Sequence, residues 1–213
     1  MVSACLVDVY DTLLTCDFQT HDRVLSELAG ITQDRWRNAL SRTHPADGLG
    51  QVTRHELFDI VLRTCGIKPR EELVRKLVDT NQELILATGR LFDDALPFLD
   101  QLRSRGIAIA IVSNCGDQTR PLLTSLGIVA LADVVVLSCE VGLIKPAPRI
   151  YRHALRELGA DAADAVFVDD QAACCAGAEL AGVRGVQIVR DGDMPPGAVR
   201  TLLDVLGQAP DGG

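Results

Sequence analysis

The sequence predicts an α/β fold in which a Rossmann-like, doubly wound parallel sheet carries a helical insertion. Two observations predict it. Along most of the chain, short apolar runs rich in β-branched residues alternate with helical patterns, as expected of parallel strands joined by crossover helices. One long stretch, residues 15–88, has no convincing strand and is helical in pattern throughout. Its place after the first strand makes it an insertion in the core fold.

Each predicted strand ends at polar or glycine-rich residues. Strands of a parallel sheet are buried on both faces, so they are continuously apolar, as in the run IAIAIV. Five runs fit this description: residues 5–9, 107–112, 134–137, 165–168 and 185–189. Helical patterns cover residues 119–126, 149–158 and 172–181, then about 197–206, before a PDGG terminus that we expect to fray.

The insertion is predicted to hold four helices, near residues 18–28, 33–42, 54–65 and 70–86. Thr53 and Glu56 have the spacing of a capping box, which indicates a helix start between them. Pro69 suits the beginning of the last helix. We therefore expect a core domain made of residues 1–14 and 89–213, and a helical domain made of residues 15–88.

Composition and charge exclude several classes of partner. A chain of 213 residues with 47% hydrophobic residues can bury a core. The net charge of −8 and the lack of a basic cluster disfavour nucleic acid and anionic membranes. No apolar run approaches the ~20 residues that span a bilayer, and no signal-peptide pattern opens the chain. We expect a cytoplasmic monomer or homodimer whose seven cysteines stay reduced.

Polar side chains follow four of the predicted strands where each one ends. Ligands of an open parallel sheet bind outside the carboxyl ends of its strands, so these side chains should meet at one edge. Each could be a turn or capping residue if taken alone. Clustered carboxylates repel one another unless positive charge lies between them, and a lysine and a hard cation would supply it. The set is Asp8, Tyr10, Ser113, Asn114, Lys145, Asp169 and Asp170.

Four segments of the chain resemble the motifs of a known family. VDVYDTLL, VSNCG, LIKPAPRIY and VFVDDQAACCAGAELAG resemble, in order and spacing, the four motifs of the haloacid dehalogenase (HAD) superfamily. The insertion lies where that superfamily carries a helical cap, and GQVTRHELF is similar to a sequence common in members with small caps. The resemblance implies a hydrolase with a four-helix cap over a Rossmann-like core.

The resemblance also implies a role for each residue of the set. Asp8 would be the nucleophile that forms a covalent aspartyl intermediate. Ser113 would hydrogen-bond a substrate oxygen, aided by neighbouring backbone N–H groups, Asn114 is counted among the catalytic residues, and Lys145 would neutralise negative charge. In phosphatases of the family, Mg²⁺ bridges nucleophile and phosphate. Its ligands here would be the carboxylates of Asp8, Asp169 and Asp170 and the main-chain carbonyl of Tyr10.

The chain departs from the family's phosphatase pattern at Tyr10. Phosphatases of the superfamily have there a second Asp that protonates the leaving group, whereas 2-haloacid dehalogenases have Tyr and need no acid. Asp11 is adjacent but occupies a different position. The pair Asp169-Asp170, in contrast, resembles the metal-binding form of the fourth motif, although Cys174 replaces its usual Asn or Asp.

Three functions therefore stay open. We expect most of all a Mg²⁺-dependent phosphatase that acts on a small phosphorylated metabolite. The alternatives are a 2-haloacid dehalogenase-type hydrolase, and a weakly active HAD-like protein that binds a ligand or a partner. Substrate choice should lie in the cap, where the candidates Trp36, Arg37, Arg42 and His44 each have a simpler explanation as core, loop or surface residues.

Overall fold

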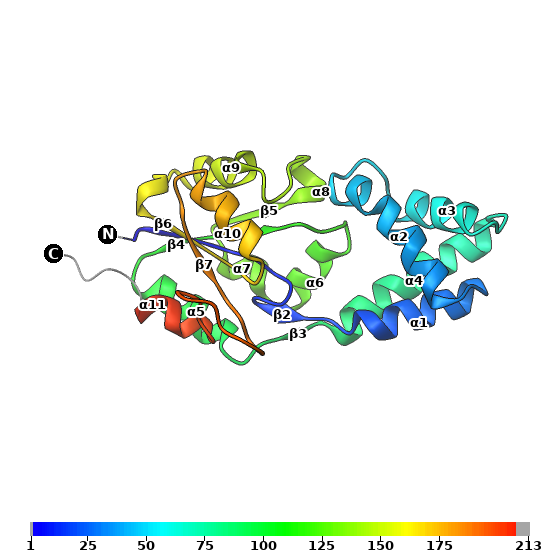
Figure 1. The fold of residues 1–213 in the computed structure, drawn as a ribbon, viewed down its shortest axis with the longest axis horizontal. Coiled ribbons are helices and arrows are strands. Elements are labelled where there is room, and N and C mark those ends of the chain that lie inside the picture. Colours follow the sequence, from blue (N-terminus) through cyan, green and yellow to red (C-terminus); the bar gives the residue numbers. More distant parts are fainter. Residues whose placement is uncertain (1, 208–213) are drawn as a thin grey trace.

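The computed structural model describes residues 2–207 and has a five-stranded parallel sheet at its centre (Figure 1). The spatial order of the strands is β5-β4-β1-β6-β7. Their bounds are β1 Ala4–Val7, β4 Ala108–Ser113, β5 Val134–Leu137, β6 Ala165–Asp169 and β7 Arg184–Gln187. All five predicted strands are present, and the fold class is confirmed.

The strand order places a topological switch beside β1. After β1 the core strands β4 and β5 build outward on one side of it, and β6 and β7 then build outward on the other. In such a sheet, the crevice that binds ligands opens where the strand order reverses, at the carboxyl ends of the central strands. Asp8, which directly follows β1, stands at that point.

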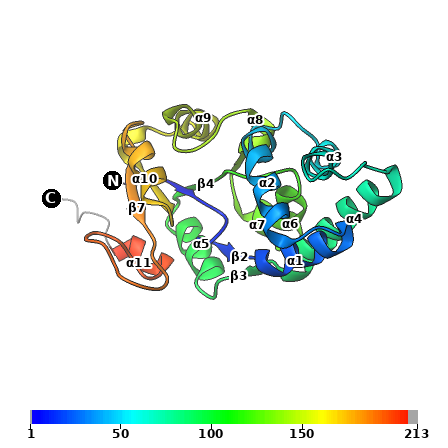
Figure 2. The same ribbon diagram turned by 45° about the vertical axis from the view of Figure 1, so that its right-hand side comes forward.

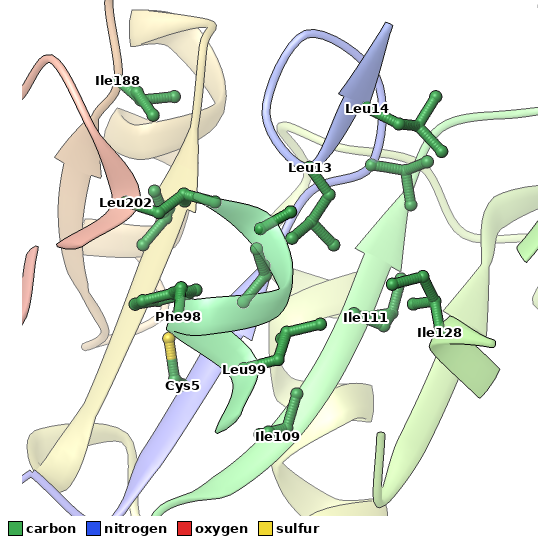
Figure 3. Close-up of a cluster of buried hydrophobic side chains, with 14 of the residues drawn as sticks. Cys5, Leu13, Leu14, Phe98, Leu99, Ile109, Ile111, Ile128, Ile188 and Leu202 are labelled. Carbon is green, nitrogen blue, oxygen red and sulfur yellow. The ribbon is translucent and has the colours of Figure 1, made fainter. Parts of the chain in front are cut away.

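Alternate residues of each central strand enter two separate hydrophobic clusters. In β1, Cys5 and Val7 face one cluster, whereas Ala4 and Leu6 face the other. The first cluster includes Phe98, Leu99 and Ile109 among the side chains drawn in Figure 3. The sheet is thus apolar on both faces because helices cover both.

Two layers of helices enclose the sheet. Helices α5 (Ala95–Ser104) and α11 (Leu202–Gly207) lie on the lower side in Figure 1, and α9 (Pro148–Leu158) and α10 (Ala172–Glu179) on the upper side. The first cluster also receives α6 (Thr119–Ser125) and α7 (Ile128–Leu131). The short α8 (Ser138–Val141) follows β5, and the 3-10 turn η1 (Ala162–Asp164) precedes β6. No helix in residues 2–207 is long and apolar enough to cross a bilayer.

Four helices form a bundle beyond the sheet edge that carries Asp8 (Figures 1 and 2). They are α1 Phe18–Ala29, α2 Gln33–Gly48, α3 Arg54–Thr64 and α4 Glu71–Thr88. The bundle has its own buried cluster, in which the rings of Trp36 and Phe58 stack with centroids 5.7 Å apart. The capping box forms as predicted, because Thr53 and Glu56 bond each other's backbone N–H.

The chain passes between sheet and bundle at two points that lie side by side. The short strands β2 (Leu14–Thr15) and β3 (Arg90–Leu91) pair antiparallel, with Thr15 opposite Arg90. Neither strand has enough residues to show the alternation that predicts a strand. This pair is the double crossing through which the bundle joins the core.

The structure differs from the prediction in several places. Helix α2 continues to Gly48 rather than ending near residue 42, and the short elements β2, β3, α7 and α8 were not predicted. Helix α5 was not predicted, because Pro97 interrupts its pattern; that proline lies in the first turn, where it displaces no helical hydrogen bond. The last helix begins at Leu202 rather than near residue 197. Residues before it extend the sheet edge instead, with Val199 N–H donating to Gln187 O over 2.9 Å. The PDGG terminus lies outside the described residues.

Candidate active site

A buried lysine joins two of the predicted carboxylates. The Nζ of Lys145 donates to Asp8 Oδ1 and to Asp169 Oδ2, both over 2.6 Å. The Lys145 side chain is 2% exposed, and those of Asp8 and Asp169 are 6% and 0% exposed. Asp8 follows β1 and Asp169 ends β6, and these strands are neighbours. The sheet edge therefore brings these groups together as predicted.

Burial and charge act on these groups in opposite directions. Burial raises the pKa of Asp8 above its usual value, and the positive charge of Lys145 offsets this only in part. Burial also opposes the positive charge of Lys145, but the carboxylates of Asp8 and Asp169 outweigh it and raise the pKa of the lysine. Lys145 is thus an ammonium throughout the neutral range and carries the only positive charge that contacts both acids among the described residues.

Asp170 has a carboxylate oxygen that nothing in the described chain satisfies. Its Oδ1 is buried and has no hydrogen-bond partner. Burial, followed by the charges of Asp169 and Asp8, raises the pKa of Asp170 to about 7. Burying a carboxylate oxygen without a partner costs free energy of folding. A bound cation would offset this cost, so the observation is consistent with Asp170 being a metal ligand.

Three carboxylates have the arrangement of a metal site. One oxygen each from Asp8, Asp169 and Asp170 lies within 4.8 Å of the other two. Asp169 is otherwise engaged at both oxygens, since Oδ1 also accepts the Gln171 N–H over 2.7 Å. Hard divalent cations such as Mg²⁺ prefer oxygen ligands of this type, so the donor set fits that ion. Of the three acids, Asp170 would be stabilised most by a bound cation, because its Oδ1 has no other partner.

Asn114 holds the backbone of Lys145 rather than a carboxylate. Its Nδ2 donates to Lys145 O over 2.8 Å, and its Oδ1 accepts the Lys145 N–H over 2.7 Å. The peptide bond that follows, Lys145-Pro146, is cis. These two hydrogen bonds fix the start of the lysine side chain, which makes Asn114 a positioning residue for the ammonium.

The loop after β4 is tied to the strand beside it. Ser113 ends β4 and is 1% exposed, next to the neighbouring end of β5. The Cys115 N–H donates to Ser138 Oγ over 2.9 Å, so the loop after Ser113 is held in place by the residue that follows β5. The structure therefore brings Ser113 to the same edge as Asp8.

The Tyr10 hydroxyl bonds to Thr119 rather than to one of the three carboxylates. Its OH lies 2.9 Å from Thr119 Oγ1, and its ring packs on Phe18 with centroids 5.5 Å apart. Burial raises the pKa of Tyr10 above its usual value, so the phenol stays protonated. Asp11, the neighbouring acid, is exposed and adopts a left-handed conformation with φ 56°. The role of the Tyr10 carbonyl as a metal ligand stays a prediction.

Sequence reasoning missed two residues that organise this region. Arg54, at the start of α3, reaches the core loop, where it contacts Asp117 and Gln118, and it also pairs with Asp47. A Cβ on Gly116 would overlap this guanidinium and force it to shift. Gln187 Nε2 donates to Asp170 O over 2.9 Å. Gln187 ends the fifth strand, and its polar side chain at that position was a usable signal.

Three of the four candidates proposed for the insertion, Trp36, Arg37 and Arg42, do not form part of this cluster. Trp36 is fully buried in the bundle core, and Arg37 pairs with Asp22 over 2.7 Å. Arg42 is exposed, and His44 lies within α2 rather than in a loop.

Comparison with known proteins places this geometry in a family. The family model described as haloacid dehalogenase-like hydrolase matches residues 2–182. Phosphatase MT3486 of Mycobacterium tuberculosis is 35% identical, over 99% of this chain and 98% of that protein. (S)-2-haloacid dehalogenase 4A of Burkholderia cepacia is 30% identical, over 90% of this chain and 85% of that protein.

A solved structure agrees with the sequence relatives. The HAD phosphatase from Thermococcus onnurineus superposes with a TM-score of 0.70 at 25% identity and covers 97% of each chain. The relatives thus include both phosphatases and dehalogenases, and the match spans sheet and insertion alike. The chain belongs to the haloacid dehalogenase-like hydrolases.

Proposed function

We propose that the protein is a Mg²⁺-dependent phosphatase that acts on a small phosphorylated metabolite. The observation that carries the proposal is Asp170, whose buried and unpartnered Oδ1 belongs to a set of three carboxylates within 4.8 Å of one another. A hydrolase that attacks carbon and releases halide has no use for such a costly group. The phosphatase relative that matches 99% of the chain supports the same choice.

Asp8 is the nucleophile in this proposal. Its Oδ1 is fixed by Lys145, which leaves Oδ2 to form a bond to phosphorus while the bond from phosphorus to the leaving oxygen breaks. Water then attacks the phosphorus of the aspartyl phosphate, which releases phosphate and restores the carboxylate. Each turnover therefore consumes one water and yields one alcohol and one phosphate.

The remaining residues prepare this reaction. Lys145 neutralises Asp8 and the incoming phosphate, and Asn114 keeps the lysine in place. Ser113 would bind a phosphate oxygen at the sheet edge. Mg²⁺ held by Asp170, Asp169 and Asp8 would supply charge neutralisation and orient the phosphate. We further propose that residues 15–88 are a cap domain that closes over the site and excludes water.

Tyr10 favours a second candidate function, a 2-haloacid dehalogenase. Its hydroxyl is bound to Thr119 and stays protonated, so Tyr10 does not replace the Asp that would protonate an alkoxide. Halide leaves without a proton, and a named dehalogenase is 30% identical over 90% of the chain. The carboxylate set argues against it, because such chemistry needs no metal.

Product analysis separates the two candidates. Purified protein is given a panel of small phosphomonoesters with Mg²⁺, and separately a panel of 2-haloacids with EDTA. We expect phosphate release that requires Mg²⁺ and is abolished in Asp8→Asn. Halide release that is insensitive to EDTA would support the dehalogenase instead. If neither product forms while a ligand still raises the melting temperature, the protein binds rather than hydrolyses.

A further inference from the structure

A cavity of about 180 Å³ lies between the inserted bundle and the core loop after β4. Half of the residues in its wall are apolar, among them Phe18, Leu25, Phe58 and Ile85, and half are polar or charged, among them Asn81 and Gln118; they come from α1, α2, α3, α4 and that loop. At about 30 Å³ for each non-hydrogen atom, as in liquid water, the space holds about six such atoms. It is the size of a small organic group.

Tyr10 links the wall of the cavity to the segment that carries Asp8. Phe18, in its wall, packs on the Tyr10 ring, which directly follows Val9 and the nucleophile. The Tyr10 hydroxyl bonds to Thr119, the neighbour of the wall residue Gln118. A substrate whose phosphate meets Asp8 would therefore extend its other end past Tyr10 and toward this cavity.

Asn81 supplies the cavity with an unused hydrogen-bond donor. The residue is 8% exposed, and its Nδ2 is buried with no partner in the described chain. Other polar groups of the wall are engaged, as shown by His21 Nε2, which lies 2.7 Å from Thr88 Oγ1. A buried amide without an acceptor is unfavourable, so a ligand oxygen that accepts from it gains binding free energy.

The charges around the cavity disfavour a second anionic group on the ligand. The guanidinium of Arg54 lines the cavity, but it already pairs with Asp47 over 3.2 Å and with Asp117 over 3.1 Å. Asp22, also in the wall, is balanced by Arg37. With two carboxylates on one guanidinium, the Arg54 cluster offers no free positive charge to a carboxylate or a second phosphate.

We propose that this cavity binds the leaving group of the substrate, and that the leaving group is a small uncharged alcohol with a carbonyl or similar acceptor oxygen that accepts from Asn81 Nδ2. This inference rests on the proposed phosphatase function and specifies its substrate class. Asn81 would then determine specificity, while the chemistry stays with Asp8 and Lys145.

Three esters of nearly equal size test the selectivity. Hydroxyacetone phosphate has a neutral carbonyl, isobutyl phosphate replaces it with a methyl group, and phosphoglycolate has a carboxylate. We expect kcat/KM to be highest for the ketone, by roughly tenfold over the apolar ester, which is the effect of one hydrogen bond. Preference for phosphoglycolate would overturn the proposal.

Variants of two adjacent amides assign the preference to Asn81. Asn81→Leu and the near-isosteric Asn81→Asp should bring the ketone-to-apolar ratio close to one. Gln82→Leu is the matched control, because Gln82 Nε2 is also buried and unpartnered but does not line the cavity. The control should keep the wild-type ratio. An unchanged ratio in both Asn81 variants would refute the assignment.

A binding measurement separates failure of this inference from failure of the phosphatase function. Uniformly ¹⁵N-labelled protein is titrated with millimolar hydroxyacetone, which needs no turnover. We expect saturable shifts of the Asn81 side-chain amide signals, identified by their loss in Asn81→Asp. Absence of any shift would mean that only water fills the cavity, and it would overturn the proposal even if phosphoesters are hydrolysed. A saturable shift supports it even if they are not.

Discussion

Replacing Lys145 by Met should destabilise the protein in a pH-dependent way. The change keeps most of the side-chain volume but removes an ammonium that lies 2.6 Å from each of two buried carboxylates. Breaking a buried ion pair in this manner costs about 3–5 kcal/mol. The structure gives a similar figure, because two negative charges no more than 4.8 Å apart repel by at least about 3.5 kcal/mol at an effective dielectric constant of about 20.

The sign of the pH dependence follows from the carboxylates that remain. Without the lysine, the pKa of Asp8, already raised by burial, rises further. Between the unfolded pKa of about 4 and the raised folded value, the folded state binds more protons than the unfolded state. Stability of the variant therefore falls as pH rises through this window. The loss of unfolding free energy in Lys145→Met should be largest near pH 8 and less than half as large near pH 5.

Urea and thermal denaturation of the metal-free proteins measure this effect. For a chain of this length, the expected loss near pH 8 lowers the melting temperature by roughly 6–20 °C. Lys76→Met is the matched control, because Lys76 is exposed on α4 and should give a change near zero at every pH. A Lys145→Met defect of equal size near pH 5 and pH 8 would refute the electrostatic explanation and point to lost packing.

Three further predictions concern the groups around Lys145. Asn114→Leu removes two hydrogen bonds to the Lys145 backbone, so it should lower the free energy of unfolding by about 1–3 kcal/mol in urea denaturation. It should also lower kcat by a larger factor than it raises KM. An unchanged kcat would contradict the positioning role. Tyr10→Phe should change the rate of phosphate release by no more than about threefold. Tyr10→Asp should raise this rate by roughly 10-fold or more, because it supplies a general acid. An unchanged rate in Tyr10→Asp would show that proton transfer does not limit turnover. Because Asp170 must lose a proton with a pKa of about 7 to bind Mg²⁺, the rise in melting temperature on adding Mg²⁺ should be larger near pH 8 than near pH 5, and equal rises would show that Asp170 is not a ligand.

The sequence predicts the convergence at the sheet edge because parallel strands present their carboxyl ends together. Asp8 and Asp169 are far apart in the chain, yet their strands are adjacent, and Lys145 joins them. To predict the site, only the carboxyl end of each strand had to be found in the sequence, and the end of each apolar run marks it. The same logic extends to Gln187, which ends the outer strand β7.

Other parts of the site depend on loop paths and side-chain direction, which residue patterns do not encode. Asn114 was predicted as a catalytic residue without a stated contact, and only the course of the loop before Pro146 shows that its amide bonds the Lys145 backbone. Asn81 is one polar position among many on an amphipathic helix, and its importance becomes visible only once the bundle surrounds it. Arg54 follows the predicted cap residue Thr53, and nothing local indicates that its side chain reaches the core.

The pairing of β2 with β3 has a consequence for how this enzyme can diverge. Thr15 and Arg90 face each other across a two-residue ladder, so both ends of the inserted segment are already held together by the core. The entropic cost of closing a loop grows only with the logarithm of its length, by about 0.6 kcal/mol for each doubling. A segment of different length or sequence can therefore replace residues 15–88 at little expense to the sheet. Under the proposed function, the double crossing would let the segment that surrounds the leaving group be replaced as a unit while Asp8 and Lys145 stay unchanged.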